Sequence, residues 1–394
     1  MPALRFKEFT DEWQEKKLGD EVRTFDGTHQ TPDYVKCGVP FYSVEHITSD
    51  NFKKTRYISE SVYDQECRRV KIENDDILMT RIGDIGTSKY ISWSPKASFY
   101  VSLALIKRVG LINMKFLDQY IKSDLIQHEL WRRTIHVAFP KKINLCEIGE
   151  CRITTPKEKE QQKIADFLTT VDEKIEKLEA KKKAFEKYKK GVMQAIFNQK
   201  IRFKKPDGSN YPDWEEKKLG DLFHEQTERK ADKKFELLSV TTNNGITKQT
   251  SSNKRDNSSA DTSNYKVVNV GDIVYNTMRM WQGASGISDF NGYVSPAYTV
   301  IRLVDGSANF FQYLFKQPRV IFNFFRYSQG LTSDTWNLKF HHFSTVEVTI
   351  PTNTTEQEKI AEFLTALDNK INLINNQLEQ AKLFKKSLLQ RMFV

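Results

Sequence analysis

Side chains that can form hydrogen bonds with the edges of nucleic-acid bases gather in a few short stretches of this sequence. Arginine can bind guanine, and glutamine adenine, through two parallel hydrogen bonds, whereas lysine and arginine also contact phosphates. The candidates in the second half of the chain are Asn276, Arg279, Gln282, Trp336, Asn337, Lys339 and His341. The candidates in the first half are Thr80, Arg81, Lys89, Arg132, Arg133, Lys141 and Lys142.

Each of these residues also has a simpler interpretation as an ordinary surface or packing residue. Trp281 and Trp336 could stack on bases, but we favour a role as core or loop anchors, because large aromatic side chains mostly serve packing. The adjacent His341 and His342 have no cysteine or carboxylate at ligand spacing, so we expect no metal site there.

Motifs with which an enzyme could act on DNA by itself are absent from the sequence. We find no Asn-Pro-Pro-Tyr-type methyltransferase motif, no glycine-rich S-adenosylmethionine loop and no nuclease constellation of the Pro-Asp, Glu-x-Lys type. Gly83, Gly86, Gly283 and Gly286 lack the Gly-Lys-Ser/Thr of a phosphate-binding loop. We therefore interpret these glycines as turn residues in loops.

A long internal repeat must supply the elements that position these side chains. The stretch KIADFLTTVDEKI at residues 163–175 returns 196 residues later as KIAEFLTALDNKI at 359–371. Each copy opens a heptad pattern typical of a coiled coil. The seam of the first helix includes Ile164, Leu168, Val171, Ile175 and Leu178, and that of the second includes Ile360, Leu364, Leu367, Ile371 and Ile374. Neither helix can bury its stripe alone, so we expect the two to pair.

Local signals place the start of each long helix. Thr155 and Glu158 could form a capping box before the first helix, with Pro156 at its first position. Thr355 and Glu358 offer the same box for the second helix, about one turn later in register. The first helix should run from about residue 158 to 198, which is roughly 60 Å at 1.5 Å per residue.

The net charge of +10 predicts a polyanionic partner, and most of the excess lies in residues 156–205, which include the first long helix. Residues 156–205 carry +7, whereas residues 1–155 carry +2, residues 206–350 carry 0 and residues 351–394 carry +1. The lysines at 181–183, 187, 189 and 190 could follow a phosphate backbone, face an acidic partner or form a solvated face. Lys189 and Lys385 occupy equivalent seam positions, where they could fix the register or extend out of the seam.

Composition predicts a water-soluble protein of two or three domains. The 394 residues are 39% hydrophobic and 28% charged. The sequence contains no run of eighteen apolar residues, which is the length needed to cross a membrane. We expect a cytoplasmic location, because the N-terminal residues show no signal-peptide pattern. The cysteines at 37, 67, 146 and 151 include no Cys-x-x-Cys pair, which favours reduced thiols over a zinc site or disulfides.

A second repeat precedes the globular part of each half. Trp-x-x-Lys-Lys-Leu-Gly-Asp occurs at Trp13 and again at Trp214, here 201 residues apart. Short β-branched and aromatic runs follow, which predicts mainly strands. Residues 267–275 indicate a strand, a turn and a strand, and residues 70–79 match them 196 residues earlier. Short amphipathic helices are predicted at 116–122 and 310–316. Between these shared elements the loops differ, as in a scaffold with exchangeable recognition domains.

These features together resemble the specificity subunit of a type I restriction–modification system. The tandem halves, the two Trp-x-x-Lys-Lys-Leu-Gly-Asp segments, the hydrophobic segments that begin at Asp76 and Asp272, and the Glu-Gln-x-Lys-Ile-Ala helices carry the resemblance. It extends over essentially all 394 residues. No single motif is diagnostic, but their duplicated order is highly specific.

The resemblance implies a non-catalytic subunit that reads double-stranded DNA. Each half would be a target recognition domain for one part of a split site, and the repeated helices would form an antiparallel spacer. Two methyltransferase subunits and restriction-translocase subunits would join it, with S-adenosylmethionine, ATP and Mg²⁺ bound by those partners and adenine as the methylated base. No cofactor is expected in this chain. The alternative is a coiled-coil scaffold or adaptor that makes no direct DNA contact.

The predicted fold class is α+β, with two mixed, strand-rich recognition domains joined by two long helices as an antiparallel coiled coil and an internal pseudo-two-fold repeat. The first recognition domain should occupy residues 1–155 and the first spacer helix residues 156–200. The second recognition domain should occupy 201–350, with a linker at 201–210, and the second spacer helix 351–394.

Overall fold

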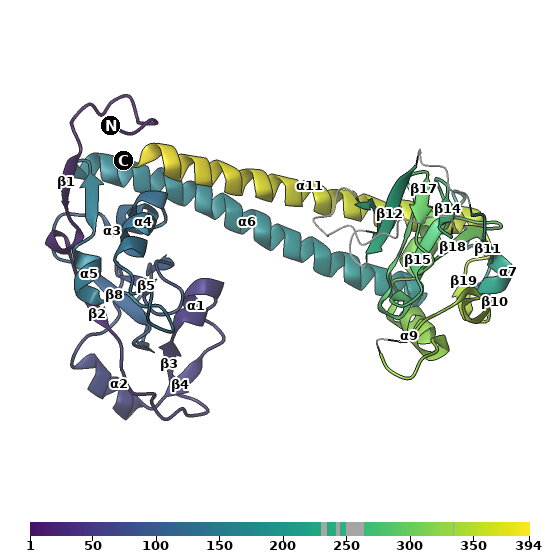
Figure 1. Ribbon diagram of the computed structural model, residues 1–394, viewed down its shortest axis with the longest axis horizontal. Helices are drawn as coiled ribbons and strands as arrows, with labels where there is room; N and C mark the ends of the chain where they lie inside the picture. The colour runs from purple at the N-terminus through teal and green to yellow at the C-terminus, as the bar shows by residue number, and fades with distance from the viewer. Residues whose placement is uncertain (230–234, 242–244, 250–263, 334) are drawn as a thin grey trace. The chain divides into compact units, whose positions relative to one another are not determined.

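The computed structural model divides into two compact units that each contain one strand-rich domain and parts of both long helices. It describes residues 1–229, 235–241, 245–249, 264–333 and 335–394. The first unit comprises Met1–Ala180 with Asn375–Val394, and the second comprises Lys181–Ile374. Figure 1 shows the elements of each unit. The four-part division expected above stays a prediction.

The domain of the first unit contains three small sheets with helices packed against them. A four-stranded antiparallel sheet has the order β2-β8-β5-β6, a three-stranded sheet has the order β4-β3-β7, and β1 pairs with β9. The strands are β1 Gln14–Lys17, β2 Val22–Asp26, β3 Val39–Tyr42, β4 Arg56–Ile58, β5 Ile77–Thr80, β6 Ser88–Tyr90, β7 Ser98–Phe99, β8 Leu103–Arg108 and β9 Arg152–Thr155. The helices are η1 Leu18–Asp20, α1 Val44–Ser49, α2 Glu60–Cys67, α3 Met114–Ile121, α4 Asp124–Arg132 and α5 Leu145–Gly149.

The domain of the second unit repeats this plan. Its sheets have the orders β11-β18-β15-β16, β13-β12-β17-β14 and β10-β19. The strands are β10 Glu215–Lys218, β11 Phe223–Gln226, β12 Glu236–Thr241, β13 Gly245–Lys248, β14 Lys266–Val268, β15 Ile273–Asn276, β16 Ser285–Ile287, β17 Gly292–Val294, β18 Tyr298–Leu303 and β19 Glu347–Ile350. The helices are α7 Leu219–Leu222, η3 Met280–Gln282, α8 Ala308–Leu314, α9 Pro318–Tyr327 and α10 Phe340–Phe343. The predicted mixed fold and the internal repeat are thereby confirmed.

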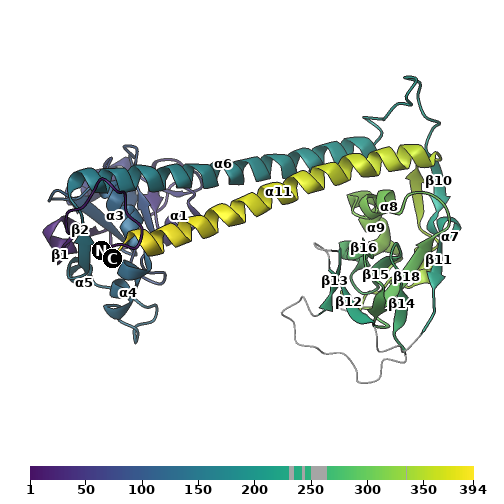
Figure 2. The same ribbon diagram turned by 90° about the horizontal axis from the view of Figure 1, so that it is seen from above.

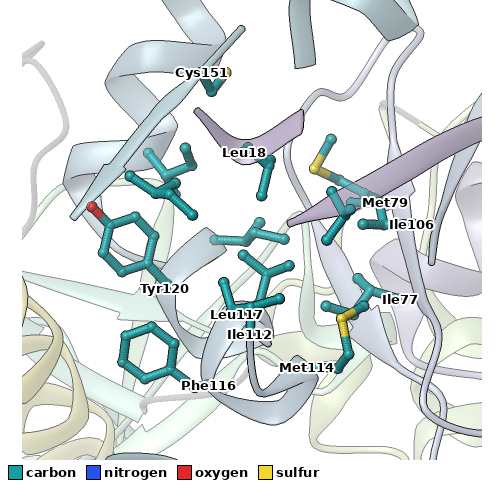
Figure 3. Packing of buried hydrophobic residues seen from close by; sticks show 14 of the residues in the cluster. Leu18, Ile77, Met79, Ile106, Ile112, Met114, Phe116, Leu117, Tyr120 and Cys151 are labelled. Atoms are coloured by element: carbon teal, nitrogen blue, oxygen red, sulfur yellow. The ribbon is translucent and has the colours of Figure 1, made fainter. Parts of the chain in front are cut away.

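One apolar core in each unit joins the domain to the long helices. In the first unit, Leu18, Ile77, Leu117 and Tyr120 come together beneath the main sheet, as Figure 3 shows. Leu168 of the first long helix belongs to the same cluster. In the second unit, Phe223, Phe311 and Phe343 pack with Leu364 of the second long helix. The start of each long helix is therefore part of a domain core as well as of the helix seam.

The two long helices have equivalent boundaries in the two copies. Helix α6 spans Glu158–Phe197 and α11 spans Thr354–Met392, so their first residues are also 196 positions apart. The expected shift of one turn between the copies is therefore wrong. Asn353, and not Thr355, caps α11, because its side-chain oxygen accepts a hydrogen bond from the Glu356 backbone N–H at 3.3 Å.

Within each unit, the α6 and α11 segments lie side by side and run in opposite directions (Figure 1, Figure 2). Ile164, Leu168, Ile360, Leu364 and Ile374 are buried. The remaining predicted seam residues are at least half-covered: Val171, Ile175, Leu178, Leu367 and Ile371. The predicted antiparallel coiled coil is confirmed.

Two ion pairs cross the helix seam at equivalent positions. Lys385 binds Asp172 in the first unit, and Lys189 binds Asp368 in the second. Each carboxylate also accepts a hydrogen bond from its own domain, from Gln119 Nε2 on α3 to Asp172 and from Tyr313 Oη on α8 to Asp368, both at 2.8 Å. Both seam lysines thus pair with an aspartate of the opposite helix, which agrees with a role in fixing the register.

A buried carboxylate at the start of each long helix binds the segment that precedes the strand-rich domain of the same unit. Glu160 accepts hydrogen bonds from the Arg5 guanidinium, at 2.7 and 2.8 Å, and from Trp13 Nε1. These bonds raise the pKa of Arg5. Both Glu160 and its equivalent in the second unit are 1% exposed.

The equivalent carboxylate of the second unit is Glu356. It accepts hydrogen bonds from Arg202 and from Trp214 Nε1. Arg202 lies in the stretch 201–210 that we predicted to be a linker, and it holds the same place as Arg5. This stretch is therefore bonded to the second unit as well as connecting the halves.

One predicted strand is absent from the first unit. Residues 267–275 form a strand, a turn and a strand as expected, namely β14 and β15. The matching residues 70–79 contain only the start of β5, because residues 70–72 have no backbone strand partner. Ile72 nevertheless packs in an apolar cluster with Leu78 and Phe99.

Replacing Glu160 with glutamine should destabilise the first unit. The Arg5 guanidinium, whose side chain is 10% exposed, would lose its counter-charge. Breaking a buried ion pair in this way should lower the free energy of unfolding by about 3 kcal/mol. Hydrogen exchange with mass spectrometry in increasing urea would locate the loss in the first unit.

The matched control is Glu158→Gln, which changes an exposed carboxylate in the first turn of the same helix. It should leave exchange rates unchanged. Equal effects of the two substitutions, or an effect of Glu160→Gln confined to the second unit, would show that this ion pair does not anchor the first unit.

Candidate nucleic-acid interface

Two loops meet at one end of the main sheet in each unit. Loop A begins with the last residue of β5 or β15 and comprises residues 80–86 in the first unit and 276–283 in the second. Loop B comprises residues 135–142 in the first unit and the described residues between 329 and 337 in the second. A bridge between Ile135 and Lys142 closes the first loop B, and one between Gln329 and Asn337 closes the second.

Equivalent backbone hydrogen bonds connect loop A with the residues just after loop B. The Leu338 N–H donates to the Thr277 carbonyl at 2.8 Å in the second unit. The Ile143 N–H donates to the Arg81 carbonyl at 3.0 Å in the first. The two units therefore present the same pair of loops on the same framework, although the loop sequences differ.

Arg279 and Gln282 project from loop A of the second unit. Both residues are exposed, and their backbones are held in a tight turn because the Gln282 and Ala284 N–H groups donate to the Arg279 carbonyl. Among the described residues, Arg279 has no ion-pair partner. Asn276 instead stabilises the loop, since its side-chain oxygen accepts a hydrogen bond from the Met278 N–H. Two side chains suited to paired base contacts are thus available on a fixed turn.

Aromatic side chains hold loops A and B of the second unit together. The rings of Trp281 and Trp336 lie edge to face, with their centroids 5.3 Å apart. Phe325 of α9 packs edge to face against Trp336 at 4.9 Å. The Trp281 indole N–H donates to the Met278 carbonyl. These contacts agree with the interpretation of both tryptophans as loop anchors.

Lys316 stabilises the end of loop A in the second unit. Its ammonium group donates hydrogen bonds to the carbonyls of Gly283 and Ser285. Burial lowers the pKa of Lys316 to about 8. Gly283 has a φ of +80°, a left-handed backbone conformation that glycine adopts without steric cost. In this conformation its carbonyl accepts the hydrogen bond from Lys316. Gly286, by contrast, is not a turn residue: it lies in β16, where a Cβ would come within 2.9 Å of the Gly245 Cα.

The other candidates of the second unit lie next to these loops. Lys339 is exposed and precedes α10, on which His341 is exposed and His342 half-buried. Burial and the neighbouring His341 and Lys339 lower the pKa of His342. The Asn337 side-chain amide donates to the carbonyls of Gln329 and Thr335, so it stabilises loop B.

Thr80 and Arg81 of the first unit do not present their side chains to a ligand, contrary to the prediction. Thr80 is fully buried and donates to Asp84. The Arg81 guanidinium is buried and donates to the carbonyls of Val101 and Ile143, and this burial lowers its pKa. Both residues continue from the central strand β5, which explains their burial, so they shape loop A and do not reach a base in this conformation.

Some basic candidates of the first unit form ion pairs, and others do not. Arg132 and Arg133 form ion pairs with Glu129, and Lys89 pairs with Asp50. Lys141 and Lys142 of loop B are exposed. The Lys141 ammonium lies 4.6 Å from the centre of the Trp131 ring. Among these candidates, the two loop B lysines are the ones that form no ion pair with another described residue.

Among the described residues, no group of three or more histidine, cysteine, aspartate or glutamate side chains could hold a metal ion. In the same part of the chain, no helix has the length and apolar content needed to span a bilayer.

A family model for the type I restriction modification DNA specificity domain matches the chain twice, over residues 10–187 and 211–383. The chain belongs to this specificity-domain family. Each match contains one complete domain, including its loops A and B. The resemblance noted in the sequence is thereby confirmed, and with it a family whose members recognise DNA sequences.

Similar proteins of known structure share the fold of this family member. An S subunit of the type I restriction-modification system from M. genitalium covers 100% of this chain and 99% of its own, with a TM-score of 0.61 and 14% identity. A chain from a structure concerning complex assembly and conformational transition of the type I R-M system covers 97% of both chains, with a TM-score of 0.54 and 12% identity.

A sequence relative comes from Methanocaldococcus jannaschii and carries the name of a type I restriction enzyme MjaX specificity subunit. It is 23% identical over 229 residues. The match covers 54% of this chain and spans about half the length of that relative, 53%.

The sequence did not single out several residues that define these loops. Val137, Phe139 and Leu331 are exposed apolar side chains of loop B, and Lys316 supports loop A. Val137 and Phe139 lie in a Val-Ala-Phe-Pro stretch, which suggests a buried turn when composition alone is considered. The only available signal was the cluster of arginines and lysines on both sides of that stretch.

Proposed function

We propose that this chain is the DNA-recognition subunit of a type I restriction–modification complex and that it reads a two-part, gapped target. Each strand-rich domain would read one half-site with its loops A and B. The observation that carries this proposal is the duplication of one loop framework with different side chains in the two copies. A protein that reads two unrelated short sequences needs such a pair of domains.

The chemistry of reading would differ between the two half-sites. In the second unit, Arg279 and Gln282 have the reach and the donors for paired contacts with guanine and adenine in the major groove. In the first unit, Lys141 and Lys142 would contact phosphates and thereby fix the position of the domain on the duplex. In the second unit, loop A would therefore make most of the base contacts. In the first unit, loop B would lie against the phosphates of the DNA.

Two methyltransferase subunits would bind the chain, and restriction-translocase subunits would join the complex. The internal pseudo-two-fold repeat supports this stoichiometry, since a repeated surface binds a partner twice. S-adenosylmethionine, ATP and Mg²⁺ would be bound by those partners, which would methylate adenine, whereas this chain would be non-catalytic. A cytoplasmic location follows from this role.

Methylome sequencing of a host that expresses this chain together with a methyltransferase subunit tests the function. We expect methylated adenines in a gapped motif with two specific parts. A host without this chain provides the control and should lack that motif. If no motif depends on the chain, the alternative of a coiled-coil scaffold without DNA contact would be favoured.

Lengthening both long helices should lengthen the gap in the target. We propose inserting one heptad after Leu178 and another after Ile374, which keeps the apolar seam in register. Seven residues add about 10.5 Å, or roughly three base pairs at 3.4 Å each. The motif read by methylome sequencing should keep both half-sites and gain a longer gap.

Insertion of the heptad into α6 alone is the matched control. It shifts one seam against the other and should reduce stability and methylation together. A double insertion that altered a half-site sequence, or that left the gap unchanged, would disprove the idea that helix length sets the spacing.

Arg279→Ala should relax specificity at one position of one half-site. A guanine contact through two hydrogen bonds contributes about 1–3 kcal/mol to discrimination. Competition binding with every single-base variant of the motif would measure it. A loss of affinity shared equally by all sequences would identify Arg279 as a phosphate contact instead.

A further inference from the structure

Loop B of the first unit exposes apolar side chains that the fold does not use. Val137 is 96% exposed, and Phe139 is exposed over its entire side chain. The backbone of the loop is nevertheless fixed at its base, because the Ile135 N–H donates to the Lys142 carbonyl at 2.8 Å and the Gly83 N–H donates to the Lys141 carbonyl at 2.8 Å. A fixed loop with an uncovered apolar tip indicates a surface that binds something.

Loop B of the second unit shares this feature. Leu331 is 100% exposed, and the Gln329–Asn337 bridge closes that loop as the Ile135–Lys142 bridge closes the first. The amino-acid sequences of the two loops differ, yet each exposes a large aliphatic or aromatic side chain. This shared property does not follow from the packing of either domain core.

The surroundings of the apolar tip in the first unit favour DNA as the partner. Lys141 and Lys142 are exposed beside Phe139, and Arg132 lies at the end of the neighbouring α4. Cationic side chains around a small apolar tip match a polyanion better than they match an apolar protein surface. The tip also belongs to the loop that we assign to the DNA interface.

We propose that Val137 and Phe139 read the methyl group of a thymine in the half-site bound by the first unit, and that Leu331 has this role in the other half-site. Thymine carries the only apolar group on the base edges of the major groove, its C5 methyl. A polar side chain gains nothing from that group, whereas an apolar side chain can bury it. This inference rests on the proposed function and adds a specificity determinant to it.

Insertion of Phe139 between two base pairs is the competing way to bury it against DNA. Insertion requires unstacking of a base step, which costs a few kcal/mol, and mostly accompanies minor-groove binding. Contact with a thymine methyl requires no such deformation. For this reason we choose methyl reading and make insertion an outcome of the test.

The experiment removes the thymine methyl group from the DNA and, separately, the apolar side chain of Phe139 or Leu331 from the protein. Deoxyuridine replaces each thymine of the methylome-defined motif in turn, and binding is measured for the full chain in complex with its methyltransferase subunits. With the wild-type chain, one position of each half-site should lose affinity about fourfold, the effect of one buried methyl group. With Phe139→Ala, this loss should disappear in one half-site only, and with Leu331→Ala in the other.

Leu111→Ala is the matched control. Leu111 is 80% exposed on the connection between β8 and α3, away from loops A and B in the sequence. The complex with Leu111→Ala should bind all of these duplexes with the affinity of the wild-type complex. Salt dependence gives a second readout: Phe139→Ala should keep the slope of log K against log salt, whereas Lys142→Ala should reduce it by about one.

Three results would overturn the methyl-reading proposal while leaving the proposed function intact. These are specific binding with no thymine-methyl dependence, a dependence that Phe139→Ala and Leu331→Ala leave unchanged, and a 2-aminopurine signal of unstacking that Phe139→Ala abolishes. The last result would assign insertion instead. A wild-type complex that binds no motif at all would overturn the proposed function itself.

Discussion

Each unit depends on one buried carboxylate in the first turn of a long helix. Glu160 and Glu356 each bind an arginine and a tryptophan from the segment at the start of the same domain, so they connect the beginning of each domain with the helix that follows it. A buried charge is tolerated only when it is paired, and here the pairing crosses more than 140 positions of the chain. This contact and the adjacent apolar core hold the start of the domain against the long helix.

The same contact is formed in both copies although the two repeats in the sequence have different spacings. The helix repeats are 196 residues apart and the tryptophans 201, yet Trp13 meets Glu160 as Trp214 meets Glu356. The tryptophan and its carboxylate are 147 positions apart in the first copy and 142 in the second, so the second domain is five residues shorter between them. The interaction partners are thus maintained although the chain between them differs in length.

The elements that depend on periodic patterns could be predicted from the sequence. The heptads predicted both long helices and their pairing, and the family resemblance followed from the duplicated motifs. The candidate site was predicted less well, because a residue type does not reveal the depth of its side chain. Arg81 looks like a DNA contact until β5 is seen to be a central strand, and Phe139 looks like a core residue until loop B is seen to expose it.

The seam ion pairs suggest how the chain arose. Asp172 and Asp368 are equivalent positions of the two copies, and so are Lys189 and Lys385. A single half of the chain contains both partners, so two copies of such a half could form both ion pairs with one another. Fusion of two such halves into one polypeptide, followed by divergence of the loops, would have kept this contact between them.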